Sequence, residues 1–279
     1  MYIQKIMIYM NILLICSKND LAAVNFFETL TTLDFGFTKF SKNLWFLDKD
    51  NKIFLILIEK MHLYLEQEEI ISFEKEANLE FEQIIFLSKH STLSEIKPRT
   101  ISVHAVGNWG KAELGGKDET IVKTDSILIR SLLLNFYNQK PKTTPFEIKQ
   151  EATHHGPYLD KSTIFVEIGS DENAWKDKPV CEFVCKELIK VISDYDKEEI
   201  KQERKWIEVV GFGGSHYCTK FNRLTFVPEN KYCFGHVIPD YALKQIFDKK
   251  KLKEILEQAK EKSNSSIIID ENLKEVISF

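Results

Sequence analysis

The sequence predicts an α/β fold of three layers, α/β/α, built around a mixed, mostly parallel sheet. Short apolar runs of strand length alternate along the chain with stretches of helical periodicity, and strands separated by helices pair in parallel with helices on both faces. The 279 residues are 43% hydrophobic and include only 11 glycines and 7 prolines. This composition suits a single packed domain over residues 1–279.

The first predicted strand is the apolar run 12–16, whose continuity is typical of a buried parallel strand. A helix follows it, with Asn19 or Asp20 as the N-cap, and ends near Leu33. Further strands are predicted at 53–60, 83–90, 99–106, 146–153, 163–168, 206–210 and 267–269. Further helices are predicted after an N-cap at Thr124 or Asp125, at 174–192, at 241–262 and at the C-terminus.

The N-terminal stretch MYIQKIMIYMNILLIC is apolar enough to suggest a signal peptide. It has no small-residue cleavage site, Lys5 interrupts it, and its apolar part is too short to span a bilayer. The residues before Ile12 are expected to form an edge strand or an irregular extension. The sequence therefore predicts a cytoplasmic protein with no membrane partner.

The charge balance excludes a nucleic-acid binder that works by charge alone. Lys and Arg total 38 against 42 Asp and Glu, a formal net charge of −4, whereas such a binder is strongly basic. Any binding of RNA must therefore use local patches and a shaped pocket. The lysine-rich stretches 197–205 and 249–251 are interpreted as solvated helix faces, with contact to a nucleic-acid backbone as the alternative.

The cysteines do not predict a disulfide framework, because their number, 5, is odd and the chain is long enough to build a core. Cys181 and Cys185 stand four residues apart in a helical pattern. We interpret them as small buried residues on one helix face, with a pair of metal-binding thiolates as the alternative.

The candidates for chemistry lie in three loops, each of which follows a predicted strand. The first is SVHAVGNWG, residues 102–110. A strand that delivers an imidazole and then turns through glycines can place His104 beside closely approaching backbone. The alternative is a core histidine bonded to a backbone carbonyl, with Trp109 as a hydrophobic plug.

The second loop, ATHHGP at residues 152–157, contains two adjacent histidines. Neighbouring residues of an extended chain point to opposite faces, so His154 and His155 reach one site only if the chain turns, and Gly156-Pro157 supplies a turn. Imidazole is a common metal ligand and the usual general base near neutral pH. A purely structural pair is the weaker alternative.

The third loop is VGFGGSHY, residues 210–217. Its glycines do not complete the G-x-G-x-x-G pattern of a dinucleotide site. They are instead expected to expose the backbone N–H groups of Gly213 and Gly214 beside His216, an arrangement that suits an oxyanion next to a base or a metal. The alternative is a tight, strained turn with a polar end.

His236 and Glu167 complete the candidates, whereas His62 and His90 are interpreted as surface or structural residues. The sequence has no G-x-S-x-G nucleophile elbow, which weakens a serine hydrolase interpretation. It also lacks H-E-x-x-H and a Walker A loop.

Taken together, SVHAVGNWG, ATHHGP, VGFGGSHY and the later FGH, with ICSKND after the first strand, resemble the motifs of the archaeal and plant type of D-aminoacyl-tRNA deacylase. The matches run from about Cys16 to His236. The resemblance implies a three-layer fold related to phosphorylases and peptidyl-tRNA hydrolases, and dependence on zinc. It also implies hydrolysis of the ester between a D-amino acid and the terminal ribose of tRNA, with D-tyrosyl-tRNA as a typical substrate.

One segment departs from the family pattern. After His216-Tyr217 the family tends to continue with a small residue and then Pro-Arg-Phe, whereas this chain reads CTKF. Lys220 therefore offers a point charge where the family has a bidentate guanidinium. The RNA contacts at this loop are expected to differ accordingly.

These observations give one hypothesis for the site. Zinc is expected to be held by some of five residues: His154, His155, His216, His236 and Glu167. The catalytic residues are expected to be His104 as general base, His155, and the N–H groups of Gly213 and Gly214. Substrate binding is expected from Asn108, Trp109, Ser215, Tyr217 and Lys220.

Two rival functions remain open. The first is a related hydrolase, such as a peptidyl-tRNA hydrolase or an amidase. The second is a non-catalytic tRNA-binding or nucleotide-binding protein that stacks bases on Trp109 and Tyr217. The partner expected from the first hypothesis is D-aminoacyl-tRNA, and the protein itself is expected to be a monomer or a homodimer.

Overall fold

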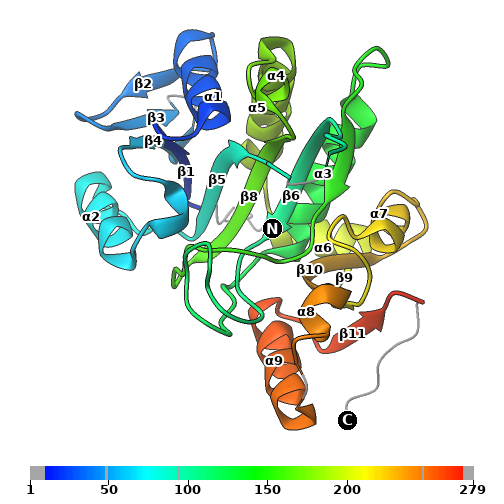
Figure 1. The fold of residues 1–279 in the computed structure, drawn as a ribbon. Coiled ribbons are helices and arrows are strands. Elements are labelled where there is room, and N and C mark those ends of the chain that lie inside the picture. The colour runs from blue at the N-terminus through cyan, green and yellow to red at the C-terminus, as the bar shows by residue number, and fades with distance from the viewer. Residues whose placement is uncertain (1–9, 48–49, 93–94, 247, 273–279) are drawn as a thin grey trace, which may run out of the picture.

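The computed structural model describes residues 10–47, 50–92, 95–246 and 248–272, and it confirms the predicted α/β class (Figure 1). A mixed sheet has the strand order β2-β3-β4-β1-β5-β8-β6-β7, and a smaller sheet has the order β10-β9-β11. The strands of the large sheet are β1 (Ile12–Ser17), β2 (Phe37–Lys39), β3 (Leu44–Leu47), β4 (Asp50–Ile58), β5 (Gln83–Lys89), β6 (Thr100–Ala105), β7 (Glu147–Gln150) and β8 (Ser162–Gly169). Those of the small sheet are β9 (Ile207–Phe212), β10 (Tyr232–Ile238) and β11 (Ile267–Asp270).

The centre of the large sheet is parallel, but one pairing reverses direction. β1 pairs in parallel with β4 and β5, and β5 pairs in parallel with β8. β6 runs antiparallel to β8, with His104 opposite Phe165 and Ser102 opposite Glu167. β6 and β7 are parallel to each other, as are β5 and β8, but the two pairs run in opposite directions. The C-terminal ends of β6 and β7 therefore lie on the opposite side of the sheet from those of β5 and β8.

One face of the large sheet is covered by the helices α1 (Leu21–Thr32), α3 (Ser126–Gln139) and α5 (Lys178–Ser193). Apolar side chains of these helices, such as Phe26 and Phe136, pack there against alternate strand residues. The predicted N-caps are present, since Asp20 accepts from Ala23 N at 2.9 Å and Asp125 accepts from Leu128 N at 3.1 Å.

The other face holds a second apolar cluster, to which α2 (Gln67–Ala77) contributes Ile70 and Ala77. The strands contribute to this cluster the residues whose side chains point away from the first face, including Phe86 of β5 and Phe165 of β8. Because both faces are buried, the central strands are almost continuously apolar, as the run 12–16 suggested.

The small sheet was not expected from the sequence. β9, predicted at 206–210, and β11, predicted at 267–269, were expected as strands, but β10, β2 and β3 were not. The short 3-10 helix η1 (His62–Tyr64) and the helices α2 and α7 (Thr219–Thr225) were also not predicted. β10 lies against α3, so the small sheet joins the body of the molecule through that helix (Figure 1).

Two long predicted helices are each broken in the structure. The stretch 174–192 divides into α4 (Glu172–Trp175) and α5, because Asp177 caps a new start and Pro179, which has no N–H, fits only the first turn. The stretch 241–262 divides into α8 (Asp240–Leu243) and α9 (Lys249–Lys262), where the Asp248 side chain accepts from Lys250 N. The predicted C-terminal helix and the extension before Ile12 fall largely outside the described residues.

The cysteine and lysine predictions have different outcomes. Cys181 and Cys185 are buried side by side in the core, as interpreted. In α6 (Lys197–Arg204), the interpretation as a solvated face is wrong for two residues: Lys197 and Lys201 pair with the buried Glu208 at 3.0 and 2.9 Å. Within the ranges that the structure describes, no helix is long and apolar enough to cross a membrane.

Candidate active site

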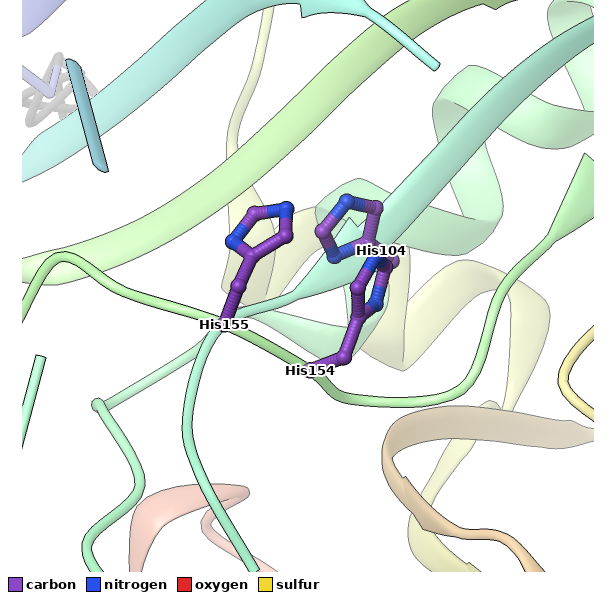
Figure 2. Close-up of side chains that lie close together, drawn as sticks. All are labelled: His104, His154 and His155. Atoms are coloured by element: carbon purple, nitrogen blue, oxygen red, sulfur yellow. The ribbon is translucent and has the colours of Figure 1, made fainter. Parts of the chain in front are cut away.

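Three imidazoles from distant parts of the chain converge on one point. His104 lies on β6, whereas His154 and His155 lie just after β7, and Figure 2 shows the three rings together. One ring nitrogen of each lies within 4.8 Å of the corresponding nitrogens of the other two. The ring centroids of His104 and His154 are 4.2 Å apart, and those of His154 and His155 are 4.3 Å apart. This spacing is suited to shared coordination of one ion.

All three rings are held in the same way. Nδ1 of His104 lies 3.0 Å from the carbonyl oxygen of Ala105. Nδ1 of His154 lies 2.8 Å from the oxygen of Ala152, and Nδ1 of His155 lies 2.7 Å from that of Gly156. Since a carbonyl oxygen only accepts, each Nδ1 carries the proton and donates it. Each Nε2 is therefore left with a lone pair, which is how backbone carbonyls orient metal-binding histidines.

The turn that brings His154 and His155 to one side occurs at His155 itself. His155 has φ of 45°, in the left-handed region that non-glycine residues rarely adopt. Its carbonyl oxygen accepts from Gly107 N at 2.9 Å, which ties this loop to the first one. Gly156 is needed for close approach, because a Cβ there would lie 2.3 Å from the backbone nitrogen of Gly116.

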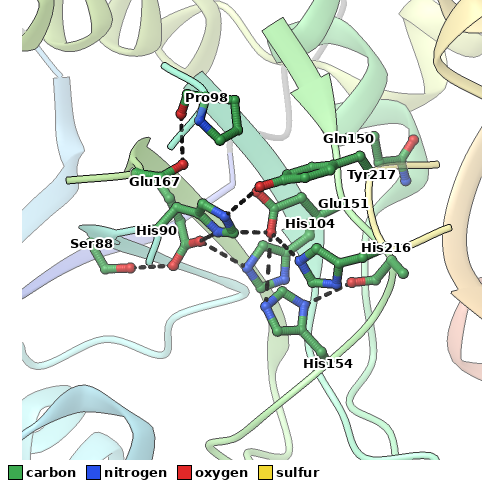
Figure 3. Close-up of polar contacts among 12 residues, drawn as sticks. Ser88, His90, Pro98, His104, Gln150, Glu151, His154, Glu167, His216 and Tyr217 are labelled. Carbon is green, nitrogen blue, oxygen red and sulfur yellow. Dashed lines mark hydrogen bonds and ion pairs between the residues drawn. The ribbon is translucent and has the colours of Figure 1, made fainter. Parts of the chain in front are cut away.

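Glu151 is the centre of the polar network beside these rings (Figure 3). Its side chain is fully buried, and Oε2 lies 3.2 Å from Nδ1 of His90, 3.1 Å from Nε2 of His216 and 3.8 Å from Nε2 of His154. Its second oxygen, Oε1, is buried and has no hydrogen-bond partner among the residues that the structure describes. Such an oxygen is costly to bury unless a cation or a donor meets it.

Glu167 of β8 forms the other half of the network. Its Oε1 accepts from the Ser88 hydroxyl at 2.5 Å, and its Oε2 lies 3.6 Å from both Nδ1 of His90 and Nε2 of His104. His90, directly after β5, thus lies between two carboxylates (Figure 3). One oxygen each of Glu151 and Glu167 and one nitrogen of His104 also lie within 4.8 Å of one another.

The electrostatics divide the histidines into two kinds. Burial lowers the pKa of His155 to about 3, and burial lowers the pKa of His154 as well, so both rings are neutral at physiological pH. Burial also opposes the charge on His90, but hydrogen bonds to Glu151 and Glu167 outweigh it and raise the pKa of His90 to about 11. His90 is therefore a buried cation that lowers the pKa of both carboxyl groups, together with His216 beside Glu151 and His104 beside Glu167.

His104 lies between these two kinds. Burial lowers its pKa, but the carboxylate of Glu167, 3.6 Å from its Nε2, outweighs burial and raises the pKa. A metal ion would therefore compete with a proton for its Nε2, which makes metal binding dependent on pH.

The comparisons with known proteins show the family of this chain. A family model described as D-aminoacyl-tRNA deacylase matches residues 77–277. The chain belongs to this family. A D-aminoacyl-tRNA deacylase from Thermococcus kodakarensis is 34% identical, with 81% of this chain and 79% of the relative covered. One from Picrophilus torridus is 30% identical, with 92% of this chain and 88% of the relative covered. The resemblance drawn from the motifs is thereby confirmed.

A solved structure supports the fold of this deacylase-family chain. A crystal structure described as a conserved protein of unknown function matches with a TM-score of 0.78 and 27% identity, covering 97% of this chain and 88% of the other. The likeness thus extends over the small sheet as well as the large one. The enzyme class predicted from the motifs, a hydrolase of ester bonds, is the class of the family.

His236 does not join the cluster, contrary to its expected role as a ligand. Its Nε2 lies 2.8 Å from the carbonyl oxygen of Val122, and its Nδ1 lies 3.0 Å from the Thr153 hydroxyl. Both nitrogens are therefore in use. The His236 side chain holds the segment just before His154 in place. His236 is therefore not one of the residues that could hold the metal.

The third loop divides between the site and the surface. His216 reaches the network through Glu151, and Tyr217 reaches it through His90. Gly213 N donates to the carbonyl oxygen of Ile238 at 2.8 Å, so this N–H is not available to an oxyanion. The nearest neighbours of Gly213 and Gly214 include the Glu271 side chain, whose negative charge disfavours an anion. The structure therefore excludes Gly213 N–H from the predicted oxyanion hole, whereas the role expected of Gly214 N–H stays a prediction.

Ser215 and Lys220, expected to bind substrate, lie with these glycines. Ser215 is exposed, with its hydroxyl 3.5 Å from that of Thr219. Lys220 pairs with Glu271 at 3.5 Å. Both line a separate hollow that contains none of the clustered histidines.

The other expected substrate-binding residues have internal partners. The amide nitrogen of Asn108 donates to the carbonyl oxygen of Gly115 at 2.8 Å, and Trp109 is only 6% exposed, with Nε1 donating to Thr153 O at 2.9 Å. The hydroxyl of Tyr217 lies 3.0 Å from Nε2 of His90. Asn108 and Trp109 shape the first loop, and Tyr217 orients His90. These contacts leave Trp109 and Tyr217 poorly placed to stack on a base.

Two functional residues escaped the sequence reasoning. His90 was interpreted as surface or structural, and the surface alternative is wrong, because the residue is 4% exposed and lies within the network. Glu151 was not considered. Two features of the sequence could have indicated these residues. His90 comes directly after a predicted strand, and Glu151 stands three residues before His154. His62, interpreted in the same way as His90, is buried beside Phe165 with ring centroids 5.2 Å apart.

Proposed function

We propose that this protein is a zinc-dependent D-aminoacyl-tRNA deacylase, which hydrolyses the ester between a D-amino acid and tRNA. The observation that carries the proposal is the convergence of three oriented imidazoles, next to two buried carboxylates, in a member of this family. The relatives named D-aminoacyl-tRNA deacylase supply the substrate class.

The residues that would hold zinc are His104, His154 and His155. Three neutral imidazoles with one position left open are a usual donor set of catalytic zinc. The fit is supported by Nε2 of His104, which is buried and has no hydrogen-bond partner within the described part of the chain. When bound, zinc lowers the pKa of a coordinated water and polarises an ester carbonyl. This arrangement assigns His104 to the ligands and removes it from the role of general base.

The role of base falls to Glu151, whose Oε1 is the acceptor that lacks a partner. In the reaction, water adds to the acyl carbon, the bond from that carbon to the ribose oxygen breaks, and the ribose oxygen takes up a proton. Glu151 accepts the proton of the water, and protonated His90 holds Glu151 and Glu167 in position. An aminoacyl ester is already activated, so positioning contributes much of the remaining rate.

The test is deacylation of D-tyrosyl-tRNA and L-tyrosyl-tRNA, each with and without a chelator. We expect hydrolysis of the D-substrate alone, loss of activity with chelator and recovery on addition of zinc. Equal rates for the two hands, or full activity in the chelated protein with no bound metal, would refute the proposal. N-acylated tRNA serves as the control for the rival peptidyl-tRNA hydrolase function, and it should not be cleaved.

A non-catalytic tRNA-binding protein remains distinguishable by metal content, since a stacking module would contain no stoichiometric zinc. For a protein that acts on charged tRNA, we propose the cytoplasm as its location. The oligomeric state, monomer or homodimer, stays a prediction.

A further inference from the structure

A cavity of about 400 Å³ adjoins the histidine cluster on the side of the first loop. His154 and His155 belong to its lining, as does Trp109, which is 6% exposed. The segment 241–245, which begins in α8, contributes another part of the wall. A group bound in this cavity would therefore lie directly beside the reacting ester.

Two apolar side chains border the cavity while remaining open to solvent. Tyr241 is 45% exposed and Leu114 is 55% exposed, and both belong to its lining. The Tyr241 hydroxyl lies 3.4 Å from Nδ1 of His216, which places that end of the ring next to the polar network. Unlike Trp109 and Tyr217, Tyr241 leaves much of its surface free.

The polar groups of the rim are those that recognise a nucleotide. Gln245 is exposed and lines the cavity, and its amide can pair with the two hydrogen-bonding atoms of the adenine edge, N6 and N7. Lys111, also exposed, forms no ion pair within the described parts of the chain and can meet a phosphate. Single-stranded RNA ends are recognised in this way, by stacking on aromatic rings and contacts to base edges.

We propose that this cavity binds the terminal adenosine of tRNA, with the base stacked on Tyr241 and its edge facing Gln245. The proposal rests on the deacylase function proposed above. It places the ribose, and with it the ester, beside His154 and His155, which line the cavity. The amino-acid side chain then lies outside this cavity.

The test uses the whole protein and the trinucleotide CCA, whose binding is measured by calorimetry without any turnover. Tyr241→Ala is expected to raise the Kd for CCA by about 5- to 150-fold, the equivalent of one stacked base. It should raise KM for D-tyrosyl-tRNA in the same direction. Tyr241→Phe should retain the wild-type Kd, because it keeps the ring and loses only the hydroxyl near His216. Tyr64→Ala is the matched control, since Tyr64 is 54% exposed and lies outside this cavity.

A second variant tests the base edge. Wild-type protein should bind CCA more tightly than CCC, and Gln245→Ala should remove that preference. An unchanged Kd and KM in Tyr241→Ala would overturn the proposal. The proposal would also be overturned if Tyr241→Ala changed the preference among D-amino acids but left the Kd for CCA unchanged. That result would assign the cavity to the amino-acid side chain. Failure of the deacylase function is a separate result: wild-type protein would then leave D-tyrosyl-tRNA intact, whether or not CCA binds.

Discussion

Replacing Glu151 by glutamine tests whether the buried network holds the site together. The carboxylate is fully buried, and its Oε2 meets Nδ1 of His90 at 3.2 Å and Nε2 of His216 at 3.1 Å. The amide has nearly the same shape but no charge. The substitution therefore leaves His90, which is protonated because its pKa is about 11, with one carboxylate instead of two.

The magnitude follows from this geometry. Removing one partner of a buried ion pair costs about 3–5 kcal/mol. Because Glu167 remains 3.6 Å from His90, we expect the lower end, about 3 kcal/mol. A chain of this size loses about 2 °C of Tm per kcal/mol, so Tm should fall by about 6 °C. Deacylation should fall by about 10²- to 10⁴-fold, because the variant also lacks the proposed base.

The measurements are thermal unfolding by circular dichroism and single-turnover deacylation, at pH 7 with zinc present. The matched control is Glu147→Gln on the adjoining strand β7, where a 63% exposed carboxylate pairs with Lys149 at 2.7 Å. An exposed pair contributes about 0–1 kcal/mol, so Tm should hardly move. If the two variants had the same Tm and the same rate, the role assigned to Glu151 would be wrong.

Three further predictions concern the metal, the pH dependence and the backbone. His155→Ala should lose stoichiometric zinc by mass spectrometry while remaining folded, and Cys181→Ser should retain it; retention in both would exclude His155 as a ligand. Burial lowers the pKa of His236 from 6.5 to about 3. As pH falls below 6.5, this histidine takes up a proton in the unfolded chain but not in the folded protein, so the free energy of unfolding decreases. The decrease should reach about 3 kcal/mol at pH 4. Denaturant titrations should therefore show a shallower loss in His236→Gln than in wild type, and equal slopes would contradict it. Gly156→Ala should cost at least about 1–3 kcal/mol of stability, since its Cβ would lie 2.3 Å from the backbone nitrogen of Gly116, and an unchanged urea midpoint would contradict that clash.

The sequence predicted the parts of the fold that depend on local pattern. The apolar run at β1 and the N-cap at Asp20 are visible in the residues themselves, and both are confirmed. The breaks at Asp177 and Asp248 were missed because helical periodicity continues across both of them. Strand β10 was missed because Gly235 and His236 interrupt its apolar pattern.

For the site, the sequence indicated the residue types but not how their hydrogen bonds are used. His104, His154 and His155 were identified from their loops, and the structure brings them together. The glycine pattern gave no indication that Gly213 N is bonded to Ile238 O, because that bond depends on how β9 and β10 lie together. Such pairing between distant segments cannot be derived from a local motif.

The reversal of β6 explains why the site lies on a face of the sheet. If all the strands ran in parallel, the loops after them would lie together at the carboxyl ends of the strands. With β6 antiparallel to β8, His104 instead lies opposite Phe165, and Glu167 lies opposite Ser102. The polar residues of both strands thus face the loop that carries His154. Because these side chains lie on a face of the sheet, other parts of the protein pack over them, and Glu167 and His104 are almost fully buried. Electrostatic interactions between buried groups are stronger than those at a solvent-exposed edge.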